Sequence, residues 1–454
     1  MERSEALSTE PAGPMTAPAA GPDGPLSTLL DDLRWRGLVH ATSAGLPGRL
    51  ATGAPIAAYN GFDPTAASLH VGHLVPAFGL MRLQRHGVRP VALVGGATGM
   101  VGDPSGRSSE RVLLERDVVD ANAEAIRRQL ERFLDFSPGA TQAEMANNLD
   151  WLGRVGLLDF LRDVGKHFTV PYMLAKDSVQ LRLSGGLSFT EFSYMLLQSA
   201  DFLHLFREHG VELQAGGADQ WGNITAGMEL IRRVEGRAEG HEPAHGLAYP
   251  LLLTPSGAKF GKSEGGESVW LDPALTSPYR FYQYWIDADD RDVPVYLRWF
   301  TLMGREEIEA LEAERDARPE ARAAQRALAL DITERVHGRE AADVVARVSG
   351  ILFGGDPIHA DAATLEAVSR EIPTAPWPAG EPRTVTDVAI AAGAATSRGE
   401  ARRLVDQGGL SLNGRPVTDA AAGVGTDALL AGRFLLVRRG RRDYRMLVRG
   451  ADPR

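Results

Sequence analysis

Apolar runs and helical patterns alternate along the first half of the chain. The run from Pro55 to Phe62 predicts a buried strand, and Asp63-Pro64-Thr65 ends it with residues that favour a turn. A helical pattern with apolar residues near one face follows and ends around Gly87. A second apolar run, Val91 to Val94, predicts the next strand. Together these segments predict a parallel βαβ unit.

The same alternation continues to about residue 276. Helical spacing covers residues 26–39, about 110–136 and about 190–206. Residues 213–223 combine an apolar run, a glycine turn and the start of a further helix, and Leu251 to Leu253 predicts another strand. Strands that alternate with helices predict an α/β fold with a doubly wound parallel sheet. Ligands of such sheets bind at the carboxyl ends of the strands.

The remainder of the chain has a different organisation. The composition changes from about Ser277, and residues 290–350 are rich in Ala, Arg, Glu and Leu at helical spacing, which predicts a small all-α domain at 277–355. Residues 356–382 are rich in Pro and Ala and predict a linker with room for one helix. Residues 383–454 predict an α+β domain. There a capping box at Ser397 to Glu400 opens a helix, and a short strand leads into an Asn413-Gly414 hairpin turn.

Charge is distributed unevenly along the chain. The 454 residues have a net charge of −10. Residues 383–454 carry 13 Arg, no Lys and seven Asp or Glu, a net charge of +6, so the rest carries −16. A basic domain on an acidic body indicates contact with a polyanion. The candidate contacts are the arginines of its predicted helix and of its last strands: Arg398, Arg402, Arg403, Arg438, Arg439, Arg441 and Arg442.

Composition also limits the class of protein. There is no cysteine, which excludes disulfides and cysteine-based metal sites and agrees with a reducing cytosol. No apolar run is long enough to cross a membrane. Residues 1–25 are rich in Pro, Ala and Gly and lack the apolar segment of a secretory signal, so we expect a disordered tail. These features predict a cytoplasmic protein without membrane contact.

Two short motifs indicate phosphate chemistry. His70-Val71-Gly72-His73 lies at the start of the first crossover helix, where free N–H groups and the helix dipole favour an anion. Lys259 and Lys262 lie in a glycine-rich stretch that would let a mobile loop bring two ammonium groups to a phosphate. The segment from Ser256 to Ser263 also approaches a P-loop. It is one residue short and has Ser256 in place of the first glycine, so we reject that interpretation.

The order and spacing of these motifs resemble a known family. The chain resembles bacterial tyrosyl-tRNA synthetases, which are class I aminoacyl-tRNA synthetases. His70 to His73 is similar to the class I His-Ile-Gly-His motif, and Lys259 to Ser263 is similar to the Lys-Met-Ser-Lys-Ser motif. Residues 383–450 resemble an S4-type RNA-binding module. The resemblance covers nearly everything after about residue 26.

The resemblance implies an organisation and an activity. It implies a Rossmann-like catalytic domain at 26–276, an anticodon-stem-binding helical domain at 277–355 and an S4-like RNA-binding domain at 383–454. The implied enzyme joins L-tyrosine to ATP, releases pyrophosphate, and transfers tyrosine to the 3′ end of tRNA(Tyr). ATP is then a substrate that brings Mg²⁺ with it, and no tightly bound metal or organic cofactor is expected. The family resemblance also implies a homodimer.

The resemblance assigns roles to individual residues. Catalytic contacts fall on Thr65, His70, His73, Arg107, Arg111, Lys259, Lys262 and Ser263. Tyrosine recognition falls on Tyr59, Asp103, Tyr194, Gln198, Asp201 and Gln220, with Tyr59 and Asp201 at the phenol hydroxyl. ATP contacts fall on Asp63, Gly72, Gly217, Asp219 and Lys262, and tRNA contacts on Arg398, Arg402 and Arg403. The spacing of Tyr194, Gln198 and Asp201 places all three on one face of the predicted helix.

Other interpretations explain less of the chain. Another ATP-using nucleotidyltransferase would account for residues 55–105 but not for the lysine motif or the basic domain. An RNA-binding paralogue without catalysis would not need both motifs. A NAD-dependent dehydrogenase lacks its Gly-x-Gly-x-x-Gly after the first strand. A tryptophan-specific relative would not need Tyr59 and Asp201 together.

Overall fold

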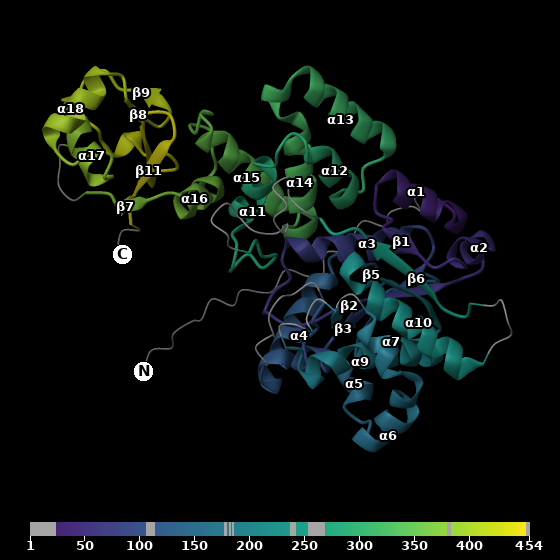
Figure 1. Cartoon of the computed structure of the whole chain (residues 1–454). Helices are drawn as coiled ribbons and strands as arrows, with labels where there is room; N and C mark the ends of the chain where they lie inside the picture. The colour runs from purple at the N-terminus through teal and green to yellow at the C-terminus, as the bar shows by residue number, and fades with distance from the viewer. Residues whose placement is uncertain are drawn as a thin grey trace. The chain divides into compact units, whose positions relative to one another are not determined.

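The computed structural model describes residues 24–105, 114–176, 179–180, 183, 186–236, 242–252, 268–378 and 383–450. The chain forms two compact units. The first comprises residues 1–276 and 288–328, and the second comprises residues 277–287 and 329–454. Figure 1 shows the elements of both units, which we describe separately.

The first unit is built on a six-stranded sheet in the order β1-β6-β5-β2-β3-β4. Its strands are β1 (Ala41–Thr42), β2 (Ala57–Phe62), β3 (Arg89–Val94), β4 (Glu144–Asn147), β5 (Val211–Gly217) and β6 (His245–Tyr249). All neighbouring pairs from β6 to β4 are parallel, and β1 pairs antiparallel with β6 at one edge. The chain proceeds outward from β2 to β4 and then returns to β5 beside β2. The doubly wound sheet is therefore confirmed, and its switch point lies between β2 and β5.

The first unit also contains helices, most of which lie around this sheet (Figure 1). They are α1 (Leu29–Trp35), α2 (Leu46–Ala51), α3 (Leu74–Arg85), α4 (Arg116–Leu130), α5 (Leu149–Leu152), α6 (Leu157–Asp163), α7 (Val170–Leu174), α9 (Phe189–His209), α10 (Trp221–Glu235), α12 (Val293–Phe300) and α13 (Arg305–Ala317). The helix α3 follows the expected apolar pattern, because Leu74, Phe78 and Met81 are all buried. The helix α9 begins after Ser188, whose side chain accepts a hydrogen bond from Glu191 N.

Three sequence predictions in this unit were wrong in detail. The first helix is shorter than 26–39, since α1 covers only Leu29–Trp35 after a short 3₁₀ turn. The helix expected at about 110–136 ends at Leu130. Phe133 and Leu134 continue the apolar pattern and are buried, but they lie in the turn that follows the helix. The helix begins at Arg116, because Glu115 has extended backbone angles.

The strand expected at Leu251 to Leu253 also lies elsewhere. The observed strand is β6, which ends at Tyr249, and Leu251 and Leu252 are outside any strand. Pro250 has no N–H to donate to the ladder, which explains why the strand stops there. Leu253 lies outside the described residues.

The second unit combines helices with a five-stranded sheet in the order β7-β11-β10-β8-β9. Its elements are α11 (Pro278–Ile286), α15 (Arg339–Leu352), α16 (Ala362–Glu371), β7 (Thr374–Pro376), α17 (Val385–Ala391), α18 (Arg398–Asp406), β8 (Leu410–Leu412), β9 (Arg415–Pro416), β10 (Phe434–Arg439) and β11 (Asp443–Val448). The helix α14 (Ala323–His337) has its first residues in the first unit and the rest here. Residues 356–382, expected as a linker, contain α16 and β7, and β7 pairs with β11.

Local signals in the second unit are largely confirmed. The Asn413-Gly414 turn joins β8 to β9, and both residues have positive φ, as a tight hairpin turn requires. The capping box is only half formed. Ser397 Oγ accepts from Glu400 N at 3.2 Å, but the Glu400 carboxylate binds Thr396 instead of returning to Ser397. Within the described parts of the chain, no helix has the length and apolar character needed to cross a membrane.

Candidate active site

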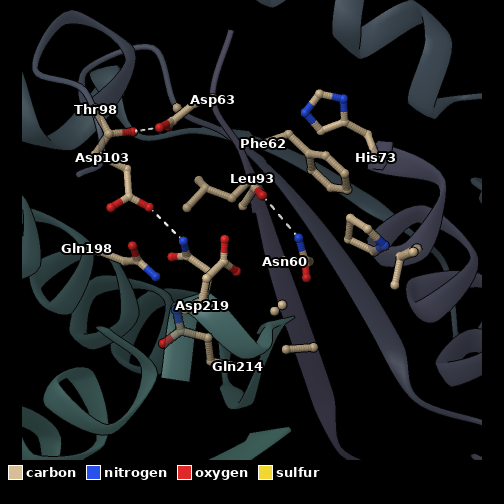
Figure 2. Close-up of a pocket in the computed structure, with 18 of the residues that line it drawn as sticks. Asn60, Phe62, Asp63, His73, Leu93, Thr98, Asp103, Gln198, Gln214 and Asp219 are labelled. Atoms are coloured by element: carbon tan, nitrogen blue, oxygen red, sulfur yellow. Dashed lines mark hydrogen bonds between the residues drawn. The ribbon is translucent and has the colours of Figure 1, made fainter. Parts of the chain in front are cut away.

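A cavity of about 420 Å³ opens at the carboxyl ends of β2 and β5, at the switch point of the sheet. Figure 2 shows side chains from β2, α9 and the segments after β3 and β5 converging on it. Around this cavity the structure places every described residue that was predicted to bind tyrosine or ATP, together with the predicted catalytic residues Thr65, His70 and His73. They are Tyr59, Asp63, Thr65, His70, Gly72, His73, Asp103, Tyr194, Gln198, Asp201, Gly217, Asp219 and Gln220.

The two histidines of the first motif form a capping box around the short 3₁₀ turn Val71–His73, which leads into α3. His70 Nδ1 accepts from Gly72 N at 3.0 Å, and His73 Nδ1 accepts from His70 N at 3.1 Å. A neutral ring that accepts at Nδ1 carries its proton on Nε2. Helix capping and ligand contact are therefore compatible functions, since capping fixes the tautomer whose Nε2–H is a donor.

One corner of the cavity combines a phenol with a carboxylate. Tyr59 lies on β2 and is 1% exposed, and its hydroxyl has no hydrogen-bond partner among the described residues. Burial, together with the charge of Asp201, raises the pKa of Tyr59 well above its ordinary value. The hydroxyl therefore stays protonated and is a donor that lacks an acceptor. Such a group is costly in an empty protein and becomes useful when a ligand supplies the partner.

Asp201 is held by two donors from the segment after β4. Asn148 Nδ2 donates to Oδ2 at 2.9 Å, and Trp151 Nε1 donates to Oδ1 at 2.8 Å. Burial raises the pKa of Asp201 to about 7, although these two hydrogen bonds oppose the shift. The carboxyl group is thus poised between its charged and neutral forms near neutral pH.

Asp63 connects β2 to the opposite wall of the cavity. Its Oδ1 accepts from Thr98 Oγ1 at 2.8 Å, and its Oδ2 accepts from Tyr194 Oη at 2.9 Å. Gly95 lies against this pair, because a Cβ atom there would come within 2.2 Å of Asp63 Oδ1 and 2.3 Å of Thr98 Oγ1. A glycine is therefore required at position 95 for this arrangement.

A second polar chain runs along the other side of the cavity. Gln220 Nε2 donates to Asp103 Oδ2 at 2.6 Å, and Asn223 Nδ2 donates to Gln220 Oε1 at 3.2 Å and to Gln198 Oε1 at 3.1 Å. Figure 2 shows Asp103, Gln198 and Asp219 facing the same space. Together with Asp63 on the first side, Asp103 and Asp219 give the cavity a negative character, which suits a cationic group such as an α-ammonium.

The cavity wall contains acids and histidines but no Lys or Arg within the described residues. Five predicted catalytic residues lie outside those residues: Arg107, Arg111, Lys259, Lys262 and Ser263. In the described parts of the chain, no group of three or more His, Cys, Asp or Glu could hold a metal ion.

Sequence reasoning missed several residues of this site. Asn148 and Trp151 hold Asp201, Thr98 holds Asp63, and Asn60 and Gln214 each carry a buried amide oxygen without a partner in the described structure. No short motif marks them. Residues 144–147 are Glu, Met, Ala and Asn, which do not favour a strand, so no signal in the sequence showed that Asn148 lies at a strand end.

The predicted tRNA-binding arginines lie in the second unit. Arg398, Arg402 and Arg403 are on α18, and all three are exposed. Arg398 donates to Asp387 at 3.0 Å. On the last strands, Arg439 pairs with Glu400 at 3.1 Å. These arginines form a basic surface that retains some internal pairing.

Comparisons with known proteins agree with this geometry. Residues 51–354 match the family model described as tRNA synthetases class I (W and Y), and residues 364–447 match the one described as tyrosine–tRNA ligase SYY-like C-terminal domain. A tyrosine–tRNA ligase of Anaeromyxobacter dehalogenans (strain 2CP-1 / ATCC BAA-258) is 53% identical over 425 residues, which cover 93% of this chain and 99% of that protein. The chain belongs to the tyrosine–tRNA ligases, class I aminoacyl-tRNA synthetases.

Further relatives of this chain belong to the same family. The ligase of Geobacillus stearothermophilus is 48% identical over 421 residues, covering 92% of this chain and 99% of that protein. Among solved structures, a C-terminally truncated mitochondrial tyrosyl-tRNA synthetase of Aspergillus nidulans is 31% identical. It aligns with a TM-score of 0.63 over 72% of this chain and 94% of that chain. The expected Rossmann-like class I fold and the expected family are therefore confirmed.

Proposed function

We propose that the protein activates L-tyrosine with ATP and transfers it to tRNA(Tyr). The observation that carries the proposal is the corner formed by Tyr59 and Asp201. There a buried phenol donor without a partner lies in the same cavity as a carboxylate held by two fixed donors. The hydroxyl of a bound tyrosine would accept from Tyr59 and donate to Asp201. Phenylalanine would leave both groups buried and unsatisfied, so it should be rejected.

The remaining walls suit the other parts of the amino acid. Asp103, Tyr194 and Gln198 would surround the α-ammonium, and Gln220, which binds Asp103, would lie near the α-carboxylate. The carboxylate oxygen then attacks the α-phosphorus of ATP. A new O–P bond forms, the bond to the bridging oxygen of the β-phosphate breaks, and pyrophosphate leaves with that electron pair. No protein nucleophile takes part, so the enzyme acts by positioning and by charge stabilisation.

The phosphates of ATP would lie near the motif His70 to His73. Thr65, His70 and His73 would donate to the leaving pyrophosphate and the ribose, while Gly72 would let the nucleotide approach the backbone. Asp63, Gly217 and Asp219 would contact the adenylate. We propose that Lys259, Lys262, Ser263, Arg107 and Arg111 add the positive charge that the described wall lacks. Mg²⁺ would arrive with ATP.

In the second step, the terminal ribose of tRNA attacks the acyl carbon and AMP leaves. The basic domain would hold the tRNA through Arg398, Arg402 and Arg403, and the helical domain would lie near the anticodon stem. We further propose a cytoplasmic homodimer. Its supporting observation is a set of exposed apolar side chains on α6, α7 and the start of α9: Leu157, Leu158, Leu161, Val170 and Phe189.

Charging of tRNA tests the complete reaction. The full-length protein should attach radiolabelled tyrosine to bacterial tRNA in an ATP-dependent reaction, and the product should release tyrosine on mild base treatment. An active protein that forms the adenylate but charges no tRNA would contradict the second step. A failure with tRNA(Tyr) transcripts and with total bacterial tRNA alike would contradict the proposal as a whole.

A further inference from the structure

A second group of aromatic side chains lies on the outer side of the Asp201 corner. The rings of Trp151 and His204 are stacked, with centroids 4.3 Å apart and planes inclined by 18°. The same indole donates its Nε1–H to Asp201 Oδ1 at 2.8 Å. The indole of Trp151 therefore contacts both the imidazole of His204 and the Asp201 carboxylate at the phenol-binding corner.

The helix α9 supplies both ends of this connection. Asp201 and His204 are three residues apart and lie near one face of the helix. The indole of Trp151 lies across that face and also packs against the apolar cluster that contains Tyr59 and Phe202. The orientation of the indole thus bears on both residues expected to bind the tyrosine hydroxyl.

His204 covers one face of the Trp151 indole beside a cavity. A separate cavity of about 500 Å³ lies beside the stack and is lined by Trp151, His204, His209 and the β4 residue Glu144, among others. His209 is engaged by Glu144 at 2.6 Å, and its ring centroid is 6.4 Å from that of Trp151 at an inclination of 51°. Removing the His204 ring would enlarge this cavity and leave the indole face uncovered.

The charge state of His204 suits a stacking function. Burial and the neighbouring His209 lower the pKa of His204, while Glu208 opposes this shift. The ring is therefore a neutral imidazole at pH 7. A neutral ring stacks on an indole through dispersion and quadrupole contacts, without demanding a counter-ion.

We propose that His204 is a positioning residue for tyrosine recognition, which holds Trp151 in the orientation that directs its N–H to Asp201. This inference rests on the proposed function. His204 does not contact the substrate. It acts through the hydrogen bond that keeps the Asp201 carboxylate aimed at the phenol hydroxyl.

The test compares His204→Ala with the wild-type protein in tyrosine-dependent ATP–pyrophosphate exchange. The phenol contact is present both before and during the reaction, so its weakening should raise KM for tyrosine with little change in kcat. We expect a rise of about five-fold, because a weakened hydrogen bond to a charged group is worth about 1 kcal/mol. KM for ATP should stay unchanged, and the preference for tyrosine over phenylalanine should fall by a similar factor.

Two further variants separate the effect of ring stacking from a general loss of packing in this cavity. His204→Phe keeps a flat ring and should restore both KM and the preference, whereas His209→Ala, in the same cavity but not stacked on Trp151, should behave as the wild type. Equal losses for tyrosine and phenylalanine, or a His204→Phe variant as impaired as His204→Ala, would overturn the inference. Thermal unfolding of each variant identifies one that has simply lost stability. Absence of tyrosine-dependent exchange in the wild-type protein would instead contradict the proposed function.

Discussion

The buried hydroxyl of Tyr59 should affect both stability and the proposed recognition of tyrosine. Because its hydroxyl lacks a partner in the described structure, Tyr59→Phe should leave the free energy of unfolding unchanged or raise it by up to about 1 kcal/mol. The same change should raise KM for tyrosine about five-fold, since one hydrogen bond to the substrate is lost. Chemical denaturation and exchange kinetics measure the two effects. A variant that is less stable but binds tyrosine normally would show that the hydroxyl has a structural partner.

Asp201 gives the site a characteristic pH dependence. Its pKa is raised to about 7 in the folded protein, from about 3.9 in an unfolded chain. The folded state therefore binds this proton more tightly, and the associated stability is present at low pH and is lost as pH rises through about 7.

The Asp201→Asn variant lacks the titrating carboxyl group and is therefore the reference for this pH dependence. Between pH 5 and pH 8, the free energy of unfolding of the wild-type protein should fall relative to the variant by about 2 kcal/mol. Denaturation curves at both pH values measure it. A difference that is independent of pH would mean that Asp201 stays ionised throughout, as its two hydrogen-bond donors would favour.

The individual site residues were predicted mainly from the resemblance to a known family and less from the spacing of residues along the chain. Tyr194 and Asp201 share a helix face, which the spacing alone predicted correctly. That spacing does not distinguish a core tyrosine from a binding one, because Tyr194 is both buried and part of the cavity wall. Asn148 and Trp151 were missed because only the folded sheet brings the segment after β4 to α9.

The helix α9 carries Tyr194, Gln198 and Asp201, three of the side chains proposed to bind tyrosine. Its first turn is capped by Ser188, whose hydroxyl accepts from Glu191 N at 3.2 Å. Ser188→Ala should lower the free energy of unfolding by about 1 kcal/mol, whereas Ser188→Gly should lower it by only a few tenths. Thermal and chemical unfolding measure this difference. Equal effects of the two substitutions would argue against a capping function for the hydroxyl.

Element types were easier to predict than element ends. The strands β2 and β3 were correct because short apolar runs followed by turn residues are typical of buried strands, and α9 was correct because its helical pattern is long. The end of α4 was wrong because Phe133 and Leu134 are buried from a turn and extend the same pattern. The strand near Leu251 was misplaced because apolar character alone does not reveal that Pro250 ends the ladder.

Across the whole molecule, the basic surface of α18 should affect only the tRNA step. Arg402→Glu should raise KM for tRNA and leave ATP–pyrophosphate exchange unchanged. If the side chain contacts a phosphate, the slope of log affinity against log salt should fall by about one. Arg34→Glu, another exposed arginine, is the control. Normal tRNA affinity and an unchanged salt slope in Arg402→Glu would exclude Arg402 from the interface.

The exposed apolar side chains of α6, α7 and α9 should mark the proposed dimer contact. Leu158 is 80% exposed and Phe189 is 77% exposed, while inner residues of the same elements pack into one apolar cluster. Such exposure is typical of interaction surfaces. A Leu158→Asp, Phe189→Asp double variant should have the mass of a monomer in light scattering. Phe353→Asp, which changes an aromatic side chain of similar exposure in the second unit, should remain dimeric. A wild-type monomer, or a double variant that stays dimeric, would contradict the proposal.

We propose above all that the cavity selects tyrosine by its hydroxyl and joins it to ATP. The most direct measurement is ATP–pyrophosphate exchange by the full-length protein with each proteinogenic amino acid in turn. Tyrosine should support exchange, with kcat/KM at least about 100-fold above that for phenylalanine, because rejecting phenylalanine rests on two buried polar groups. Exchange with phenylalanine at a comparable rate, exchange with tryptophan alone, or no exchange with tyrosine would contradict this claim.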